Sequence, residues 1–337
     1  MKRIISIASL LYISISSLHA QQTKEEMRAK ANSFTQQGNF DAAIQVLDAA
    51  LLIYPNDLDL MKDEIYAAYL NRDYTKALDI SKTALQSKDA DEETYQIAGL
   101  NYKAIADYKG GDKLYKEALK KFPSSGTLYS EYGDMLANDK NESAAIKQWE
   151  RGIQVQPSIS GNYYHAAKYY AKTGNILWGL IYAEIFINTE SLTPRTNEVK
   201  TLLANGYSKL IQNRTNIAGI KNSGSAFEKA LINCLVSAAE NLGGNISVDD
   251  ISVFRSRFII AWNNRYANEF PYKLFQYQQM LMQEGYSDAY SWWIFGADIN
   301  NDAFTKWVSS HANDSYSFKQ FQRSYLFKMP AEQYYVH

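Results

Sequence analysis

The sequence predicts an all-α fold, a right-handed α-solenoid of helix-turn-helix repeats followed by an aromatic-rich helical C-terminal region. Three observations lead to this prediction. Small residues recur every 34 residues between positions 24 and 193, bulky apolar residues recur at fixed distances from them, and proline falls near the end of several units. Self-similarity at a period of 20 to 50 residues is typical of solenoids, in which each unit buries its apolar face against the next.

Five consecutive units of 34 residues fit this pattern without insertions. They span residues 24–57, 58–91, 92–125, 126–159 and 160–193. Position 20 of each unit is a small residue: Ala43, Ala77, Gly111, Ala145 and Gly179. Positions 8 and 27 are small in most units, and two antiparallel helices can approach closely only where side chains are small.

Bulky residues and prolines complete the unit. Positions 4 and 11 carry side chains such as Met27, Phe34, Tyr95 and Tyr102, which we expect to fill the space between helix pairs. Proline at position 32 ends the second helix, because its ring blocks continuation and disfavours helical dihedrals in the preceding residue. These prolines are Pro55, Pro123 and Pro157.

This unit resembles the tetratricopeptide repeat family, whose 34-residue helix-turn-helix has small residues at positions 8, 20 and 27 and proline near 32. Units three and four resemble it most, whereas unit two departs at position 8 with Ile65 and unit five at position 27 with Phe186. A plain helical bundle with coincidental spacing is the alternative. The residues that carry the resemblance best are Tyr95, Gly99, Tyr102, Tyr108, Gly111, Tyr115, Ala118, Pro123, Tyr129, Gly133, Ala145, Trp149, Gly152 and Pro157.

The resemblance implies a concave groove lined by first helices, at positions 2, 5, 9, 12 and 13. Amides, tyrosines and lysines mix there, which suits an extended peptide or a protein segment, although each could also be an ordinary solvated side chain. The family's clamp on a C-terminal carboxylate is not carried over, because Tyr66 stands where the second repeat needs asparagine. The groove residues are Arg28, Asn32, Thr35, Lys62, Tyr66, Tyr69, Gln96, Lys103, Ser130, Asp134, Tyr164, Lys168 and Lys172.

Residues 1–20 have the layout of a secretory signal peptide. Lys2 and Arg3 precede an apolar run of about a dozen residues, which ends before Ala20. A membrane anchor is the alternative, but this run is too short to cross ~30 Å of hydrocarbon as a helix. We therefore expect an exported protein, periplasmic or secreted, that is cleaved after Ala20 and has no integral membrane segment afterwards.

Charge gives no preference for nucleic acid. The chain has 35 basic and 36 acidic residues, and removal of Lys2 and Arg3 with the signal peptide leaves 33 basic against 36 acidic residues. There is therefore no excess of positive charge to attract the phosphates of a nucleic acid. The single cysteine, Cys234, lies in an apolar-patterned segment and has no cysteine partner for an internal disulfide.

The spacing of apolar residues in the C-terminal half predicts a capping helix over residues 194–214 and a helical region over residues 215–337. Aromatic residues crowd its last seventy positions, mostly at helical spacing that indicates a packed core. Adjacent residues on a helix point about 100° apart, so Trp292 and Trp293 are not expected to face one core, and one of them is available as an aromatic platform for glycan or peptide.

Residues for catalysis are sparse. The three histidines beyond the signal, His165, His311 and His337, have no metal-ligand spacing, and there is no Cys-x-x-Cys or Gly-x-Ser-x-Gly motif. We expect no enzyme, cofactor or metal, although two acids brought together by folding would leave no local trace. The sequence favours an exported protein-protein interaction scaffold, with a carbohydrate- or peptidoglycan-binding protein as the alternative.

Overall fold

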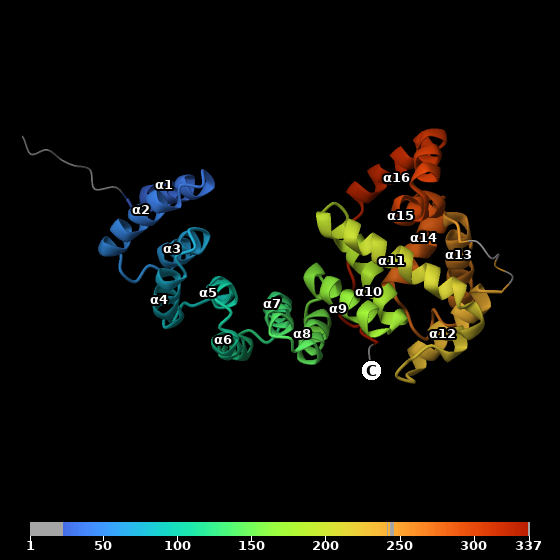
Figure 1. Ribbon diagram of the computed structural model, residues 1–337, viewed down its shortest axis with the longest axis horizontal. Helices are drawn as coiled ribbons and strands as arrows, with labels where there is room; N and C mark the ends of the chain where they lie inside the picture. The colour runs from blue at the N-terminus through green and yellow to red at the C-terminus, as the bar shows by residue number, and fades with distance from the viewer. Residues whose placement is uncertain (1–22, 241, 243–245, 336–337) are drawn as a thin grey trace, which may run out of the picture. The chain divides into compact units, whose positions relative to one another are not determined.

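The computed structural model describes residues 23–240, 242 and 246–335 (Figure 1). The expected signal peptide lies outside these residues. All regular elements of the described residues are helices, which confirms the all-α repeat fold. The chain forms two compact structural units, unit 1 (Met1–Ala90) and unit 2 (Asp91–His337). The five 34-residue units of the sequence are called repeats one to five from here on. No helix among the described residues is both long enough and apolar enough to span a bilayer.

Unit 1 contains two helix pairs. Asn and Asp side chains, together with Thr23, cap its helix N-termini, and Thr23 with Glu26 forms a reciprocal capping box that satisfies two otherwise unpaired amides. Small residues at 0% exposure, including Ala31 and Ala43, lie where the helices pack. The helices are α1 (Lys24–Gln36), α2 (Phe40–Ile53), α3 (Leu58–Leu70) and α4 (Tyr74–Leu85).

Unit 2 continues with three more pairs and a longer helix. Each pair packs along its length, and consecutive pairs stack on one another. The first helices of all five repeats begin at Lys24, Leu58, Glu92, Gly126 and Ser160, at intervals of 34 residues. In unit 2 the helices are α5 (Glu92–Ala104), α6 (Tyr108–Lys121), α7 (Gly126–Asn138), α8 (Glu142–Val155), α9 (Ser160–Thr173), α10 (Ile176–Thr189) and α11 (Pro194–Gln212).

Close packing explains the glycine at position 8 of two repeats. A Cβ on Gly133 would lie 2.3 Å from Nε1 of Trp149, and one on Gly99 would lie 2.2 Å from the hydroxyl of Tyr115. An aromatic ring of the second helix therefore lies directly on the backbone of the first, at a distance that excludes any side chain.

The turn inside each repeat has a fixed backbone geometry. Position 15 takes a positive φ in all five repeats, although in three of them the residue is not glycine. Position 16 is Asn or Asp in all five, and its side chain caps the second helix. The residue with positive φ ends the first helix, and the capping residue directly after it begins the second helix. The position 15 residues are Gly38, Arg72, Ala106, Lys140 and Gly174.

Helix α10 is the centre of unit 2. Every residue from Leu177 to Ile187 is buried, because α9 and α11 cover two sides and the C-terminal helices cover another. Phe186 departs from the small-residue pattern and packs against Tyr164 of α9 and Arg195 of α11. The C-terminal elements are η1 (Arg214–Gly219), α12 (Ala226–Ala238), α13 (Val248–Arg265), α14 (Lys273–Gln283), α15 (Ser287–Ser310) and α16 (Ala312–Ser324).

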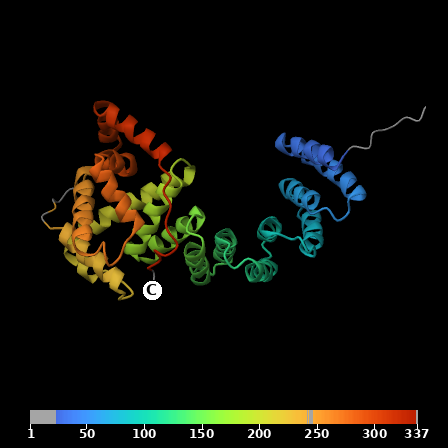
Figure 2. The same ribbon diagram turned by 180° about the vertical axis from the view of Figure 1, so that it is seen from behind.

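The segment after α16 returns to the repeats. It runs back across unit 2 (Figure 2), and Phe327 and Met329 are buried along the way. Tyr335 stacks on Phe227 with ring centres 4.6 Å apart and donates a hydrogen bond to the carbonyl of Pro271 at 3.0 Å. Tyr335 thus holds the end of the chain against α12, and Met329 lines a small cavity together with Tyr163 and Tyr182 of the last repeat.

Candidate functional site

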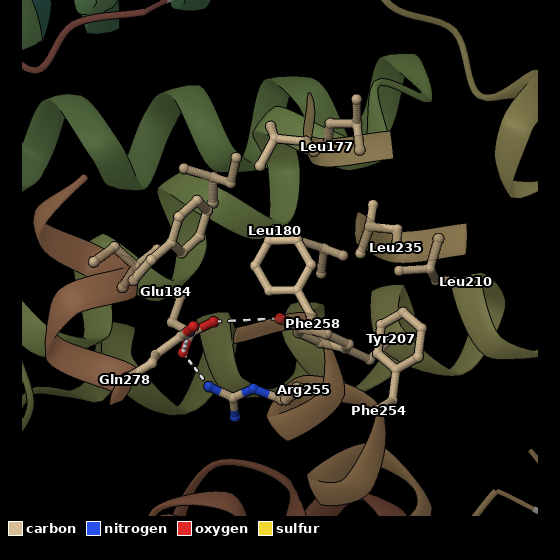
Figure 3. Close-up of a pocket in the computed structure, with 14 residues that line it drawn as sticks. Leu177, Leu180, Glu184, Tyr207, Leu210, Leu235, Phe254, Arg255, Phe258 and Gln278 are labelled. Atoms are coloured by element: carbon tan, nitrogen blue, oxygen red, sulfur yellow. Dashed lines mark hydrogen bonds and ion pairs between the residues drawn. The ribbon is translucent and has the colours of Figure 1, made fainter. Parts of the chain in front are cut away.

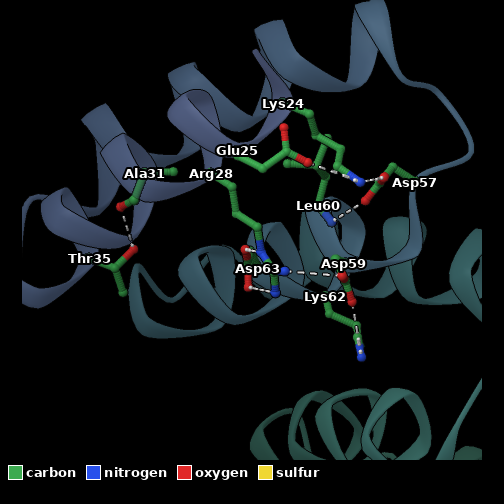
Figure 4. A network of polar contacts seen from close by, with 10 residues as sticks. All are labelled: Lys24, Glu25, Arg28, Ala31, Thr35, Asp57, Asp59, Leu60, Lys62 and Asp63. Carbon is green, nitrogen blue, oxygen red and sulfur yellow. Dashed lines mark hydrogen bonds and ion pairs between the residues drawn. The ribbon is translucent and has the colours of Figure 1, made fainter.

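The first-helix face of unit 1 is organised by Arg28 on α1 (Figure 4). Its guanidinium contacts two carboxylates on α3, with Nε 2.6 Å from Asp63 and Nη1 3.0 Å from Asp59. The hydrogen bond to Asp63 raises the pKa of Arg28. Lys62 is buried at 7% exposure and lies 3.5 Å from the other oxygen of Asp59. Adjacent first helices are thus joined by ion pairs on the face predicted to bind.

The other predicted residues of unit 1 differ in exposure. Tyr66 is 43% exposed, whereas Tyr69 packs against Tyr74 with ring centres 6.0 Å apart. Asn32 is half-buried, and the hydroxyl of Thr35 donates a hydrogen bond to the carbonyl of Ala31 in the same helix. Tyr66 therefore presents the largest accessible ring of this face.

Unit 2 has a first-helix face of its own, which begins with an ion pair between α5 and α7. Nζ of Lys103 lies 2.7 Å from Asp134, so two predicted residues meet. Gln96 and Ser130 are half-buried beside them. Glu131 is also half-buried, and burial raises its pKa to about 7. The face thus mixes a fixed cation with a carboxyl group that titrates near neutrality.

Tyr164 on α9 is enclosed by cations. Nζ of Lys168, on the same helix, lies 4.8 Å from its ring centre, and the guanidinium of Arg195, on α11, lies 5.0 Å from it. The tyrosine hydroxyl donates to Glu198, which also pairs with Lys168 at 2.6 Å. Such cation–π and ionic contacts order the long side chains without burying them.

Two more side chains complete this end of the face. His165 stacks on Trp149 at 5.0 Å between ring centres, and burial lowers its pKa to about 4. Lys172 pairs with Glu142 of α8 at 2.5 Å and stays mostly exposed. A neutral imidazole and an accessible ammonium therefore lie on the same helix.

Sequence reasoning missed Glu131 and four further charged residues of these faces. Asp59 and Asp63 partner Arg28, and Arg195 and Glu198 frame Tyr164. A signal for the second pair was available, because extending the 34-residue frame to a sixth unit places Arg195 and Glu198 at positions 2 and 5. Helix α11 thus supplies groove-type residues in addition to covering the last repeat.

The two tryptophans of the predicted platform point to different surroundings. Trp292 stacks on Trp307 at 5.6 Å and 13°, and Trp307 stacks on His311 at 4.9 Å and 11°. Trp293 instead packs against Tyr290 and holds Nζ of Lys200 at 4.0 Å from its ring centre. The two tryptophans thus have different neighbours, as expected for adjacent helical residues, and Trp292 forms a row of near-parallel rings with Trp307 and His311.

A buried polar cluster lies among α10, α13, α14 and α15 (Figure 3). The carboxylate of Glu184 accepts hydrogen bonds from Arg255, from Gln278 at 2.5 Å and from Tyr290 at 2.9 Å. The adjoining cavity has a volume of about 40 Å³, room for a very few waters. Among the described residues that line this cavity, Glu184 is the one carboxylate. No group of residues in the described part of the chain could hold a metal ion.

Comparisons with known proteins agree with the repeat assignment. Residues 28–92 match the sequence model of the tetratricopeptide repeat. No curated protein matches the sequence. Similar solved structures include a tetratricopeptide repeat protein from Parabacteroides merdae, with 14% identity, a TM-score of 0.45, and coverage of 76% of this chain and 98% of that chain.

Two further structures are similar over about half of this chain. A thermophilic TPR protein from Thermus thermophilus has 14% identity, a TM-score of 0.43, and coverage of 55% of this chain and 98% of that one. YrrB, described as a TPR protein with an unusual peptide-binding site, has 16% identity, a TM-score of 0.40, and coverage of 53% and 92%.

Proposed function

We propose that this chain, a protein of the tetratricopeptide repeat family, is an exported and non-enzymatic scaffold that holds a peptide or protein segment against its first-helix faces. The observation that carries this proposal is the set of ordered but accessible polar side chains on those faces. Lys103, Lys168 and Lys172 are each held by a carboxylate, yet their side chains keep 32%, 44% and 67% exposure.

The energetics of these pairs support a binding role. Exposed ion pairs contribute only about 0–1 kcal/mol to stability, so the repeats do not depend on them for folding. They nevertheless restrict long side chains in advance, which lowers the entropy that a partner must overcome on binding. Tyr66, which is 43% exposed, adds aromatic area of the kind enriched at interfaces.

Affinity capture from native extract tests this function. The bait is the chain from Gln21, compared with Lys168→Glu on the first-helix face and with Lys147→Glu, which is exposed on α8. We expect a protein partner that Lys168→Glu loses and Lys147→Glu retains. Equal recovery by all three baits, or no protein partner, would contradict the proposal.

Export is tested separately, by the mass of the protein recovered from the cell envelope or the medium. Cleavage after Ala20 predicts a mature N-terminus at Gln21. Recovery of the uncleaved chain from the cytoplasm alone would contradict export and leave the scaffold proposal intact.

Glycan binding is a second candidate, supported by the near-parallel rings of Trp292, Trp307 and His311, which are half-buried or exposed. Soluble peptidoglycan fragments should then change tryptophan fluorescence in the parent and not in Trp307→Ala. An unchanged spectrum in the parent would exclude this candidate.

A further inference from the structure

A cavity of about 630 Å³ lies in unit 2 between the end of α9, the start of α10, α11 and η1. This volume falls within the range of about 300–1,000 Å³ that is typical of sites for small organic ligands. The cavity is separate from the paired side chains of the first-helix faces and from the row of aromatic rings described above. It is much larger than the cavity of about 40 Å³ beside Glu184.

The cavity exists because α11 differs from the other first helices. It has 19 residues where they have 13 or 14, so it extends past the end of α9, and η1 then turns back beside it. Gly206 lies at the crossing with α10, where a Cβ would come within 2.6 Å of Leu180. The small residue lets the two helices approach and leaves the space beyond them open.

The floor of the cavity is apolar. Leu180, Leu210 and Ile217 line it, and their exposed fractions are 8%, 3% and 1%. The three side chains come from α10, α11 and η1, which are packed together, so the floor is formed in advance of any ligand. Such a surface accepts an aliphatic or aromatic body at little cost in conformational entropy.

The rim is polar and carries one charge. Asn205, Lys209 and Asn216 line the cavity, and no hydrogen bond or ion pair within residues 23–240, 242 and 246–335 engages their side chains. Lys103, Lys168 and Lys172 each have a carboxylate partner, whereas no Asp or Glu is present in the lining of this cavity. The ammonium of Lys209 is exposed and has no carboxylate beside it among the described lining residues, so it can pair with an anionic ligand.

We propose that this cavity binds a small organic carboxylate with an apolar body. The carboxylate accepts hydrogen bonds from the ammonium of Lys209 and the amides of Asn205 and Asn216, and the body lies on the apolar floor. This site is independent of the scaffold function, because it uses none of the residues assigned to the first-helix faces.

Calorimetric titration with 4-methylpentanoate tests the proposal. The neutral 4-methylpentanamide is the matched ligand, and the matched protein control is Lys229→Met, an exposed lysine on α12 outside the cavity. We expect the parent and Lys229→Met to bind the acid and not the amide. Lys209→Met should lose at least about tenfold in affinity, as is usual for loss of a charge-assisted hydrogen bond, and Lys209→Arg should retain most of it.

Three results of this titration would overturn the proposal. They are no heat of binding to the parent, equal affinity for acid and amide, and unchanged affinity in Lys209→Met. Binding of a peptide with C-terminal leucine, without binding of 4-methylpentanoate, would also overturn it and would assign the cavity to a peptide end. Circular dichroism of each variant verifies folding, and Lys209 is exposed, so its replacement should not disturb the helices.

Discussion

Replacement of Arg255 by methionine should destabilise unit 2 strongly. Its side chain is 8% exposed and that of its partner Glu184 is 2% exposed, so both charges are removed from water. Burial opposes the charge of Arg255, but the Glu184 carboxylate and nearby tyrosines outweigh that effect and raise its pKa. Removing one partner of such a pair leaves the other charge uncompensated, which typically costs about 3–5 kcal/mol.

The structure places the expected cost at the lower end of this range. Without Arg255, the Glu184 carboxylate still accepts hydrogen bonds from Gln278 at 2.5 Å and from Tyr290 at 2.9 Å. Tyr207 contributes a longer contact at 3.4 Å. These donors stabilise part of the charge, so we expect a loss of about 3 kcal/mol in the free energy of unfolding.

Urea denaturation followed by tryptophan fluorescence measures this loss. All six tryptophans lie between positions 149 and 307, so the signal reports unit 2 and not unit 1. The double variant Glu184→Gln with Arg255→Met should recover most of the stability, because a neutral amide oxygen still accepts from Gln278 and Tyr290. Lys116→Met, which breaks an exposed pair with Asp112, is the control and should cost less than about 1 kcal/mol.

Two results would refute this reasoning. The first is a single variant Arg255→Met that unfolds at the same urea concentration as the parent. The second is a double variant no more stable than Arg255→Met, since the cost would then arise from lost packing instead of an unpaired charge.

Three further predictions concern the repeats. Ala106→Gly should stabilise unit 2 by about 0.5–1 kcal/mol in urea denaturation, because relief of a left-handed alanine exceeds the added chain entropy. Gly133→Val should destabilise it by about 1–3 kcal/mol in the same assay, since its side chain would overlap the ring of Trp149. Burial raises the pKa of Glu131 from 4.5 to about 7, so the folded state binds the extra proton and its stability falls as pH rises through this window. Glu131→Gln should therefore gain up to about 3 kcal/mol over the parent between pH 4 and pH 8, measured by denaturation at each pH.

Controls for these predictions come from the same chain. Gly174→Ala at the matching position of repeat five should lose stability where Ala106→Gly gains it. The pKa of His165 is lowered, so its contribution changes with pH in the opposite sense, and only the difference between Glu131→Gln and the parent isolates the carboxyl group. A difference that does not vary with pH would show that Glu131 titrates normally.

Much of the repeat geometry can be predicted from local patterns in the sequence. The 34-residue spacing of small residues predicts where first helices begin, because close approach of two helices restricts side-chain size at fixed positions. Asn or Asp at position 16 of all five units carried a further signal that the sequence-based prediction did not use, since it caps each second helix directly after the turn. Capping and helix pairing act over a few residues, so a single sequence is enough to show them.

The partners of individual side chains were decided by the tertiary structure alone. The pairing of Arg28 with Asp63, and the turning of Trp292 and Trp293 toward different neighbours, depend on contacts between helices that the repeat frame does not encode. The cavity beside Lys209 depends on the length of α11 and on the return of η1, which follow from packing against α10. The sequence by itself determined the repeat and the residue types on each face, whereas the structure determined which of those residues meet, because long-range contacts leave no local periodicity to read.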